Sequence, residues 1–272
     1  MQHRHQDRQQ YFNEQSESTK KYVIPYIQQG MENTIGKGCR VLEIGCGEGG
    51  NLHPFLEMGC ECYGVELSEG NYNNALKFFE NDPLRDHLFL LNNNIYDVTL
   101  NSLGGAFDIV FLRDVIEHIR EQKNFMKHLK KFVAPNGVIF FAFPPWRMPF
   151  GGHQQVIRKK WVSLLPYIHL LPRGFYRRFL KCTGLTEGEI ESLLEIAETG
   201  ISIHRFENIF RHEKYEVLRK THWFFNPNYQ IKFGLTPRRV YRIFQLPHIQ
   251  DFYTTAMYYL LKTQENCSSV IN

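Results

Sequence analysis

Residues 41–50 read Val41-Leu42-Glu43-Ile44-Gly45-Cys46-Gly47-Glu48-Gly49-Gly50, and this stretch decides the fold. It begins as an apolar strand, ends in a glycine-rich turn, and is followed by a helix-like segment, Asn51–Leu56. Glycine permits tight, often positive-φ backbone and lets a ligand lie against the main chain. The pattern therefore predicts a nucleotide site at the carboxyl end of a parallel strand.

The charges around this turn indicate which nucleotide it binds. Gly45, Gly47 and Gly50 satisfy the dinucleotide spacing G-x-G-x-x-G, so spacing alone does not exclude NAD or FAD. Glu43 and Glu48, however, bring two carboxylates to a place where a pyrophosphate needs positive potential. They favour a ligand with an ammonium group, a positive sulfur and no phosphate, which describes S-adenosylmethionine.

The segment Glu43-x-Gly45-x-Gly47-x-Gly49 resembles motif I of the class I S-adenosylmethionine-dependent methyltransferases. Cys62–Glu66 resembles the second strand of that family, whose terminal acid, here Glu66, accepts hydrogen bonds from both ribose hydroxyls. Asn94 stands where the family usually has an aspartate for the adenine amino group, and its amide oxygen can also accept. The resemblance implies a cofactor site made by Glu43, Gly45, Cys46, Gly47, Gly49, Glu66, Leu67, Asn94, Ile95 and Arg113.

Further segments follow in the family's order. Phe107–Leu112 resembles the fourth strand, and Val133–Phe143 resembles the turn and fifth strand. The resemblance covers residues 40–145. It implies an α/β fold with a doubly wound, Rossmann-like sheet of seven strands, the last antiparallel, and a helical lid inserted after strand five.

We expect three regions along the chain. Residues 1–145 would hold amino-terminal cap helices and the cofactor-binding core, 146–213 a basic helical substrate lid, and 214–272 the last strands. Within these regions, a capping box and an apolar stripe predict a helix over 187–198. The remaining patterns predict helices within 11–35 and over 203–212, and strands over Tyr215–Phe225 and Phe252–Lys262.

Three side chains are candidate catalytic groups. Glu117 and His118 follow the fourth strand and resemble an acid–histidine pair found near the transferred methyl in some family members. His153 lies in a glycine-rich loop after the fifth strand and is a second candidate base. The alternatives are that Glu117 and His118 cap or pack a helix, and that His153 is an exposed loop residue. The twelve histidines form no short-spacing metal motif, so we expect no metal site.

Composition indicates a soluble globular protein. The chain has 272 residues, of which 43% are hydrophobic, and it contains no apolar run long enough to cross a membrane. The segment His3–Gln10 lacks the apolar stretch of a signal peptide. The six cysteines include no C-x-x-C pair and are typical of reduced thiols, so we expect a cytoplasmic location.

The net charge of +4 is divided unevenly. Residues 147–240 hold 16 Lys or Arg against 8 Asp or Glu, which leaves the rest of the chain acidic. Segment 161–181 mixes apolar residues with cations, which favours either contact with an anionic membrane or the buried face of a lid. Pro144-Pro145-Trp146 follows the fifth strand, whereas the similar motif of DNA amino-methyltransferases follows the fourth, which argues against nucleic acid.

These observations predict methyl transfer from S-adenosylmethionine to oxygen of a small organic or lipid-like acceptor, with nitrogen or carbon as weaker alternatives. Two other functions stay open at this point. One is a non-catalytic scaffold that keeps the fold and binds a partner, which Asn94 favours because it departs from the family pattern. The other is an RNA methyltransferase that is drawn to its target by the basic lid.

Overall fold

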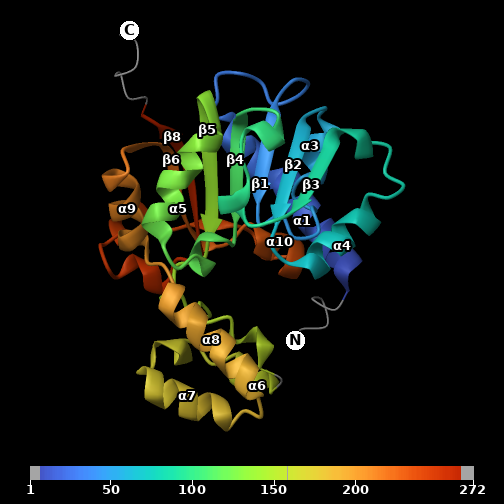
Figure 1. Cartoon of the computed structure of the whole chain (residues 1–272). Coiled ribbons are helices and arrows are strands. Elements are labelled where there is room, and N and C mark those ends of the chain that lie inside the picture. Colours follow the sequence, from blue (N-terminus) through green and yellow to red (C-terminus); the bar gives the residue numbers. More distant parts are fainter. Residues whose placement is uncertain (1–6, 158, 265–272) are drawn as a thin grey trace.

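A computed structural model describes residues 7–157 and 159–264, so part of the amino-terminal segment His3–Gln10 and Cys267 lie outside the described residues. Eight strands form one mixed sheet in the order β3-β2-β1-β4-β5-β8-β6-β7 (Figure 1). Their bounds are β1 Arg40–Ile44, β2 Glu61–Glu66, β3 Leu88–Asn92, β4 Phe107–Arg113, β5 Val133–Phe143, β6 Tyr215–Phe225, β7 Arg238–Arg239 and β8 Ala256–Thr263.

Strand directions agree with the expected α/β architecture. β1 to β5 pair in parallel, and β8 pairs antiparallel with β5 on one side and β6 on the other. The last strand is therefore antiparallel, as the resemblance implied. The difference is one additional strand, β7, which pairs antiparallel with β6 at the edge and has only two residues. A pair of residues is too short to produce a strand pattern in the sequence.

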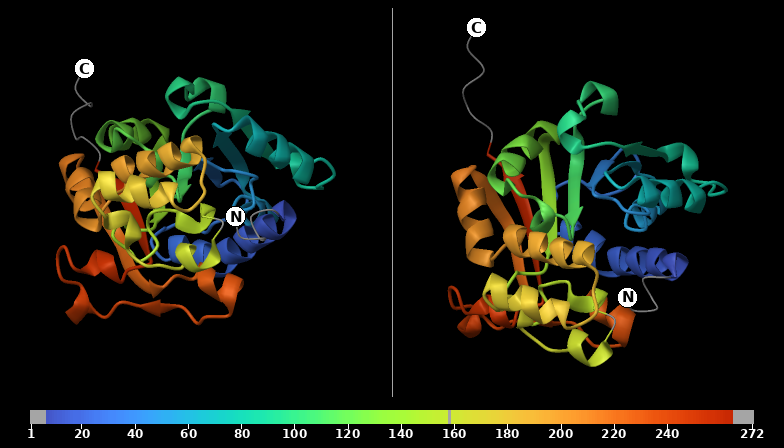
Figure 2. Two further views of the ribbon diagram at one scale, coloured as in Figure 1. Left: turned by 90° about the horizontal axis from the view of Figure 1, so that it is seen from below. Right: turned by 60° about the horizontal axis from the view of Figure 1, so that its bottom comes forward.

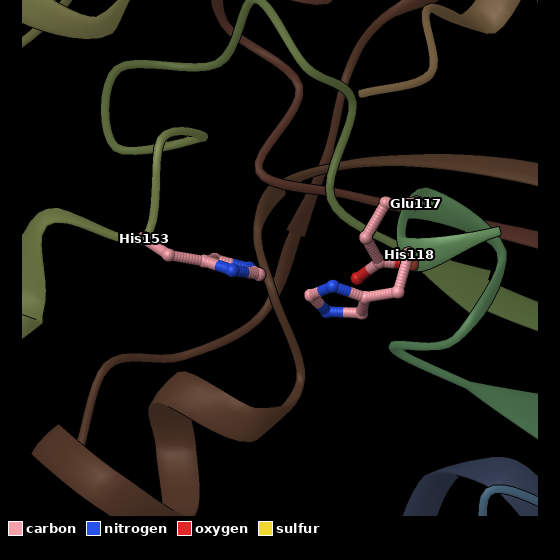
Figure 3. Close-up of side chains that lie close together, drawn as sticks. All are labelled: Glu117, His118 and His153. Carbon is pink, nitrogen blue, oxygen red and sulfur yellow. The ribbon is translucent and has the colours of Figure 1, made fainter. Parts of the chain in front are cut away.

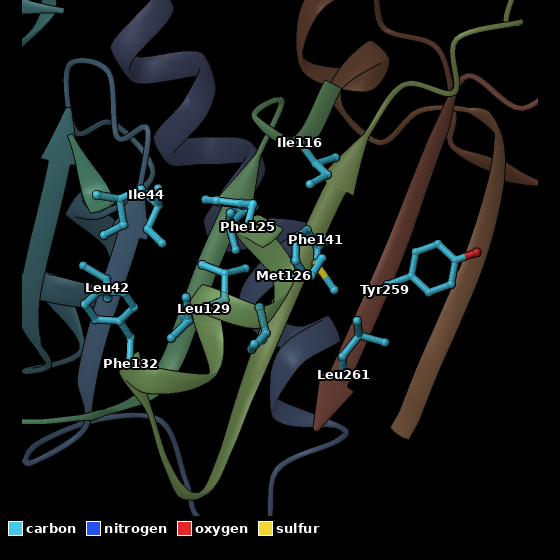
Figure 4. Packing of buried hydrophobic residues seen from close by; sticks show 14 of the residues in the cluster. Leu42, Ile44, Ile116, Phe125, Met126, Leu129, Phe132, Phe141, Tyr259 and Leu261 are labelled. Atoms are coloured by element: carbon cyan, nitrogen blue, oxygen red, sulfur yellow. The ribbon is translucent and has the colours of Figure 1, made fainter. Parts of the chain in front are cut away.

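Alternating side chains divide the sheet into two buried faces. On β1, for example, Leu42 belongs to one apolar cluster and Val41 to the other, since successive strand residues point to opposite faces. Figure 4 shows the first cluster, in which α5 (Gln122–Leu129) packs on the sheet. α9 (Ile203–His212) covers the same face. The opposite face is covered by α1 (Arg8–Ser18), α2 (Ile24–Gln28), α3 (His53–Glu57) and α4 (Glu69–Phe78).

Several predicted elements are confirmed, with shifted ends. The capped helix α8 spans Glu187–Thr199, α9 spans 203–212 and β6 spans 215–225, as expected. The amino-terminal helices end at Gln28 rather than at residue 35, and Gly30 follows where an added Cβ would lie 2.3 Å from Leu260. The last strand starts at Ala256, because Gln250–Phe252 forms a 3-10 turn.

Residues 146–200, which we call the helical insertion, extend below the sheet in Figure 1, and Figure 2 shows them from below, in front of the strand ends. They contain α6 (Lys160–Ser163), α7 (Arg173–Lys181) and α8, which share a small apolar core of their own. α9 packs on the sheet instead, so it belongs with the core and not with the lid region expected to end at residue 213. α10 (Asn228–Phe233) contacts α1 on the other side.

Trp146 anchors the insertion to the body of the protein. Its backbone N–H donates to the Ile201 carbonyl at 2.8 Å, and its ring meets His169 edge-on at a centroid distance of 4.7 Å. An added Cβ on Gly200 would lie 2.5 Å from the same indole, so glycine is needed for this close contact. Among the described residues, the helices are all too short or too polar to cross a bilayer.

Candidate functional site

A cavity of about 600 Å³ lies where β1 to β4 end, at the edge of a parallel sheet that binds ligands in this class of fold. α1 forms one wall of it, and the loop after β4 forms another. Its volume is typical of a site for one small ligand. The described residues that line it are Arg8, Tyr11, Gln15, Ile44, Gly45, Gly47, Glu48, Asn51, Val65, Glu66, Leu67, Asn71, Asn93, Asn94, Ile95, Tyr96, Arg113, Asp114, Val115, His118, Ile119 and Phe125.

The glycine loop after β1 needs its glycines for two different reasons. Gly45 has φ +71°, and an added Cβ would lie 2.7 Å from a methyl group of Val115, so a side chain there is excluded by both strain and contact. Gly47 has φ +55° and lines the cavity. Gly49 has φ +80° but does not line the cavity; its Cβ position is 2.8 Å from the Phe79 ring. Gly49 therefore allows the loop to pack closely against Phe79, on the side away from the cavity.

Glu66, at the end of β2, is held ready to accept from a ligand. Its two carboxylate oxygens accept hydrogen bonds from the backbone N–H groups of Gly47, at 2.8 Å, and Ser68, at 2.7 Å. A carboxylate has about four lone-pair sites, so two remain for further donors. Such a fixed acceptor facing the cavity fits the vicinal diol of a ribose.

The two carboxylates of the glycine loop do not act as the sequence suggested. Glu48 is almost fully buried and forms an ion pair with Arg8 of α1. Glu43 does not line the cavity; burial raises its pKa well above the usual value, and one of its oxygens accepts from Asn51 at 2.7 Å. The acids that remain at the cavity wall beside the paired Glu48 are Glu66 and Asp114.

Arg113 lines the cavity, yet its donors serve the protein itself. The guanidinium donates to Asn51 at 3.0 Å and, on α1 and the π-helical turn that follows it, to Ser18 at 3.1 Å and Thr19 at 3.4 Å. Thr19 also donates to the Asn51 side-chain oxygen at 2.8 Å, so Arg113, Thr19 and Asn51 are all hydrogen-bonded to one another. Arg113 thus fastens the amino-terminal helix over the cavity, and because it also lines the cavity, its role as a direct cofactor ligand stays a prediction.

Of the remaining residues expected to bind the cofactor, some line the cavity and one lies behind the glycine loop. Leu67 and Ile95 line the cavity, whereas Cys46 is buried behind the loop beside Gly64. Asn94 lines the cavity, and its side-chain oxygen already accepts from the Tyr96 backbone N–H at 3.1 Å. That oxygen has a second lone pair for an adenine amino group.

Sequence reasoning missed much of the wall. Arg8, Tyr11 and Gln15 come from α1, and no local motif marks them because their role depends on how this helix crosses the sheet edge. Asp114 is marked as a site residue by its backbone conformation, because it adopts φ +55° directly after β4. Non-glycine residues in this region cluster at functional sites.

The three candidate catalytic residues, Glu117, His118 and His153, come together in the structure (Figure 3). Glu117 and His118 lie on the 3-10 turn Ile116–His118, and His153 lies on the loop after β5 with φ +50°. One ligand atom from each lies within 4.8 Å of the others, and the two imidazole centroids are 5.0 Å apart. His118 also lines the cofactor cavity.

Burial sets the protonation of this cluster. It lowers the pKa of His118, and, together with the nearby His118, it lowers the pKa of His153 to about 4. Burial and the charge of Asp114 raise the pKa of Glu117 well above its usual value. At neutral pH both imidazoles are therefore uncharged, and each has one ring nitrogen with a free lone pair.

The structure argues against two of the alternatives, a helix cap for Glu117 and full exposure for His153, while the burial of Glu117 agrees with the packing alternative. Both carboxylate oxygens of Glu117 are buried and have no hydrogen-bond partner among the described residues, so Glu117 is not a helix cap. His153 is partly buried against His118 and is not a fully exposed loop residue. The prediction of no metal site was based on motifs with short spacing between ligands. In the structure, one carboxylate and two imidazoles from two separate loops lie close together.

Comparisons with known proteins agree with this geometry. A family model described as "Methyltransferase domain" matches residues 4–186. A protein of Rhizobium johnstonii named ubiquinone biosynthesis O-methyltransferase is 29% identical over 176 residues, which are 63% of this chain and 66% of that protein. A protein of the same name from Coxiella burnetii is 26% identical over 196 residues, 69% of this chain and 76% of that one. The chain thus spans just under two thirds of the first relative's length.

Solved structures show the same fold. The plantazolicin methyltransferase BpumL in complex with SAH has a TM-score of 0.55 at 13% identity, over 95% of this chain and 87% of that one. PKMT2 from Rickettsia typhi in complex with AdoHcy has a TM-score of 0.55 at 18% identity, over 90% of this chain and 54% of that one. With the fixed acceptor Glu66 and the glycine cradle, these matches show that the chain belongs to the class I S-adenosylmethionine-dependent methyltransferase family and that its cofactor is S-adenosylmethionine.

Proposed function

We propose that the protein methylates an oxygen of a small organic or lipid-like acceptor, with His118 as the base that takes the acceptor's proton. One observation carries this proposal: His118 lines the cofactor cavity and belongs to the cluster with Glu117 and His153. The relatives named ubiquinone biosynthesis O-methyltransferases support oxygen as the methylated atom.

S-adenosylmethionine supplies an activated methyl group when bound, so this chain has to orient the acceptor and remove its proton. A neutral imidazole is suited to that step, and His118 is neutral because burial lowers its pKa. His153 faces His118 and would form the wall of the acceptor site on the side of the insertion. Asp114, also at the cavity wall, would stabilise the imidazolium that forms.

The outer surface of the insertion supports a lipid-like acceptor and contact with a membrane. Several large apolar side chains there are mostly exposed, as are others in the segment after β7, which touches the insertion where the Tyr167 hydroxyl donates to the Phe252 carbonyl at 2.9 Å. Exposed aromatic residues beside arginines, here Arg238, Arg239 and Arg242 of the segment around β7, are typical of proteins that lie on anionic lipid. The exposed residues are Trp161 68%, Leu164 57%, Phe175 70%, Tyr241 77%, Ile243 76% and Phe244 54%.

The RNA alternative has less support. Arg177 on α7 forms ion pairs with Glu187 and Glu191 on α8, and Arg173 pairs with Glu198. Cations already paired within the insertion are poorly placed to release counterions from a nucleic acid. A non-catalytic scaffold would have no need for the intact cofactor cradle around Glu66.

The test is methyl transfer from labelled S-adenosylmethionine to phenols and alcohols, each with and without a long hydrocarbon tail. We expect label on the tailed acceptors and a loss of about 10²- to 10⁴-fold in kcat for His118→Asn, the usual contribution of a general base. His87→Asn, an exposed histidine outside the cavity, is the matched control and should retain full activity. Unchanged kcat in His118→Asn, with acceptor methylation intact, would rule out the proposed base.

Membrane contact is tested separately by sedimentation with vesicles. The protein should pellet with phosphatidylglycerol vesicles and not with phosphatidylcholine vesicles, and Trp161→Ser combined with Phe175→Ser should abolish this. Both side chains are mostly exposed, so the double variant should fold normally. Equal recovery of variant and parent protein in the pellet would refute the surface contact.

A further inference from the structure

Glu117 is the unexplained feature of the catalytic cluster. Its side chain is 3% exposed, and neither of its oxygens has a hydrogen-bond partner among the described residues. A buried carboxyl group without a hydrogen bond is costly whether it is neutral or charged, and buried carboxylates in proteins are normally paired or bind metal. Figure 3 shows that its carboxyl group is directed toward the imidazole of His118.

The groups around Glu117 form a ligand set. His118 and His153 each offer an imidazole nitrogen, and one ligand atom from each of the three residues lies within 4.8 Å of the others. Two imidazoles and one carboxylate, with a position left open, are a known ligand combination for Zn²⁺. In a tetrahedral site with bonds of about 2.1 Å the ligand atoms are about 3.4 Å apart, so small side-chain rotations would close this one.

The surroundings of the cluster favour a cation. Asp114 lies close enough to act on Glu117, His118 and His153 alike. Arg113, which precedes it, is occupied by Asn51, Ser18 and Thr19. His169, from the insertion, is the other ionisable group near His153, and its Nε2 lies 2.7 Å from the Trp146 carbonyl oxygen. Of these charges, Asp114 acts on all three residues of the cluster, whereas the positive charge of Arg113, which its neutral partners do not cancel, is directed toward α1 and Asn51.

We propose that Glu117, His118 and His153 bind a divalent transition-metal ion of the Zn²⁺ class, at the acceptor side of the cofactor cavity. The ion would satisfy the buried carboxylate and join the loop after β4 to the loop of the insertion after β5. It rests on the proposed function for the place of the acceptor and changes the part of His118: a ligated neutral imidazole has no free lone pair, so the ion would lower the pKa of a bound hydroxyl and His118 would hold the ion. No metal site was expected from the sequence, because that prediction was based only on ligands close together along the chain.

The test is metal binding itself, measured on the full chain after dialysis against chelator. Co²⁺ is added in steps, and its visible absorption reports ligation by nitrogen and oxygen; Zn²⁺ is then added as a competitor. We expect one Co²⁺ per chain, displaced by Zn²⁺. We expect Glu117→Gln and His153→Asn to weaken binding by at least about tenfold, as loss of groups at metal sites does. His87→Asn should bind like the parent protein.

Calorimetry with S-adenosylhomocysteine is run on every variant, so that loss of folding is distinguished from loss of a ligand. No Co²⁺ absorption in a protein that binds S-adenosylhomocysteine would overturn the proposal, as would binding that Glu117→Gln and His153→Asn leave unchanged. Failure of methyl transfer alone would count against the proposed function only, because Co²⁺ binding requires no acceptor.

Discussion

Replacing Arg113 by Met should destabilise the protein strongly. The guanidinium is 8% exposed and donates to three side chains, so the change leaves Asn51, Ser18 and Thr19 with unused acceptors. Hydrogen bonds to a charged group contribute about 1.5–3 kcal/mol each, so loss of the two shorter bonds, to Asn51 and Ser18, should cost about 3–6 kcal/mol. With a urea dependence of about 3 kcal/mol/M, the unfolding midpoint should fall by about 1–2 M.

The assay is urea unfolding followed by tryptophan fluorescence and circular dichroism. Arg120→Met is the matched control, since Arg120 is 70% exposed in a surface ion pair with Glu195, and its loss should cost at most about 1 kcal/mol. If Arg113→Met does not fold, Arg113→Lys keeps the charge and loses the forked geometry, and it should show an intermediate midpoint. A loss below about 1 kcal/mol for Arg113→Met would refute the claim that this network fastens α1.

Three further predictions concern single positions. Gly45→Ala should lose S-adenosylhomocysteine binding in calorimetry, since its Cβ would lie 2.7 Å from Val115; Gly38→Ala, with φ +87° and open space, should cost only backbone strain and keep binding. Glu66→Gln should raise the Kd of S-adenosylhomocysteine by about 10- to 100-fold, because charge-assisted bonds are about twice as strong as neutral ones, and an unchanged Kd would contradict the ribose role. Burial lowers the pKa of His222 from 6.5 to about 4, so the unfolded chain binds a proton that the folded protein excludes. Stability should therefore fall by up to about 3 kcal/mol between pH 6.5 and 4, and His222→Leu should flatten this part of a pH series of urea titrations.

The parallel strands could be predicted because motifs that resemble a known family stand at their ends. Helix α8 was located by a capping box and an apolar stripe, and β6 by an apolar, aromatic-rich stretch, signals that depend on residues near one another in sequence. β7 could not be predicted, because two residues carry no period. The boundary of the insertion was misplaced, since whether α9 packs on the sheet depends on tertiary contacts and not on its own pattern.

The site residues that directly follow a strand could be predicted from the sequence. Glu66 and His118 follow parallel strands, whose carboxyl ends share one edge, so both were expected at the cavity. The charge argument based on Glu43 and Glu48 was wrong in its mechanism. Arg8 pairs with Glu48, and burial raises the pKa of Glu43, and neither effect is visible before the chain is folded.

The helical insertion enters and leaves the body of the protein at neighbouring points, since Trp146 and Ile201 share a backbone hydrogen bond. Its apolar core is separate from the two clusters that hold the sheet. A segment joined in this way can be exchanged during evolution, or by grafting, without rebuilding the cradle that holds the adenosyl group. Chimaeras joined at residues 146 and 200 that keep a histidine at the position of His153 are therefore a direct route to new acceptor preferences on an unchanged adenosyl-binding platform.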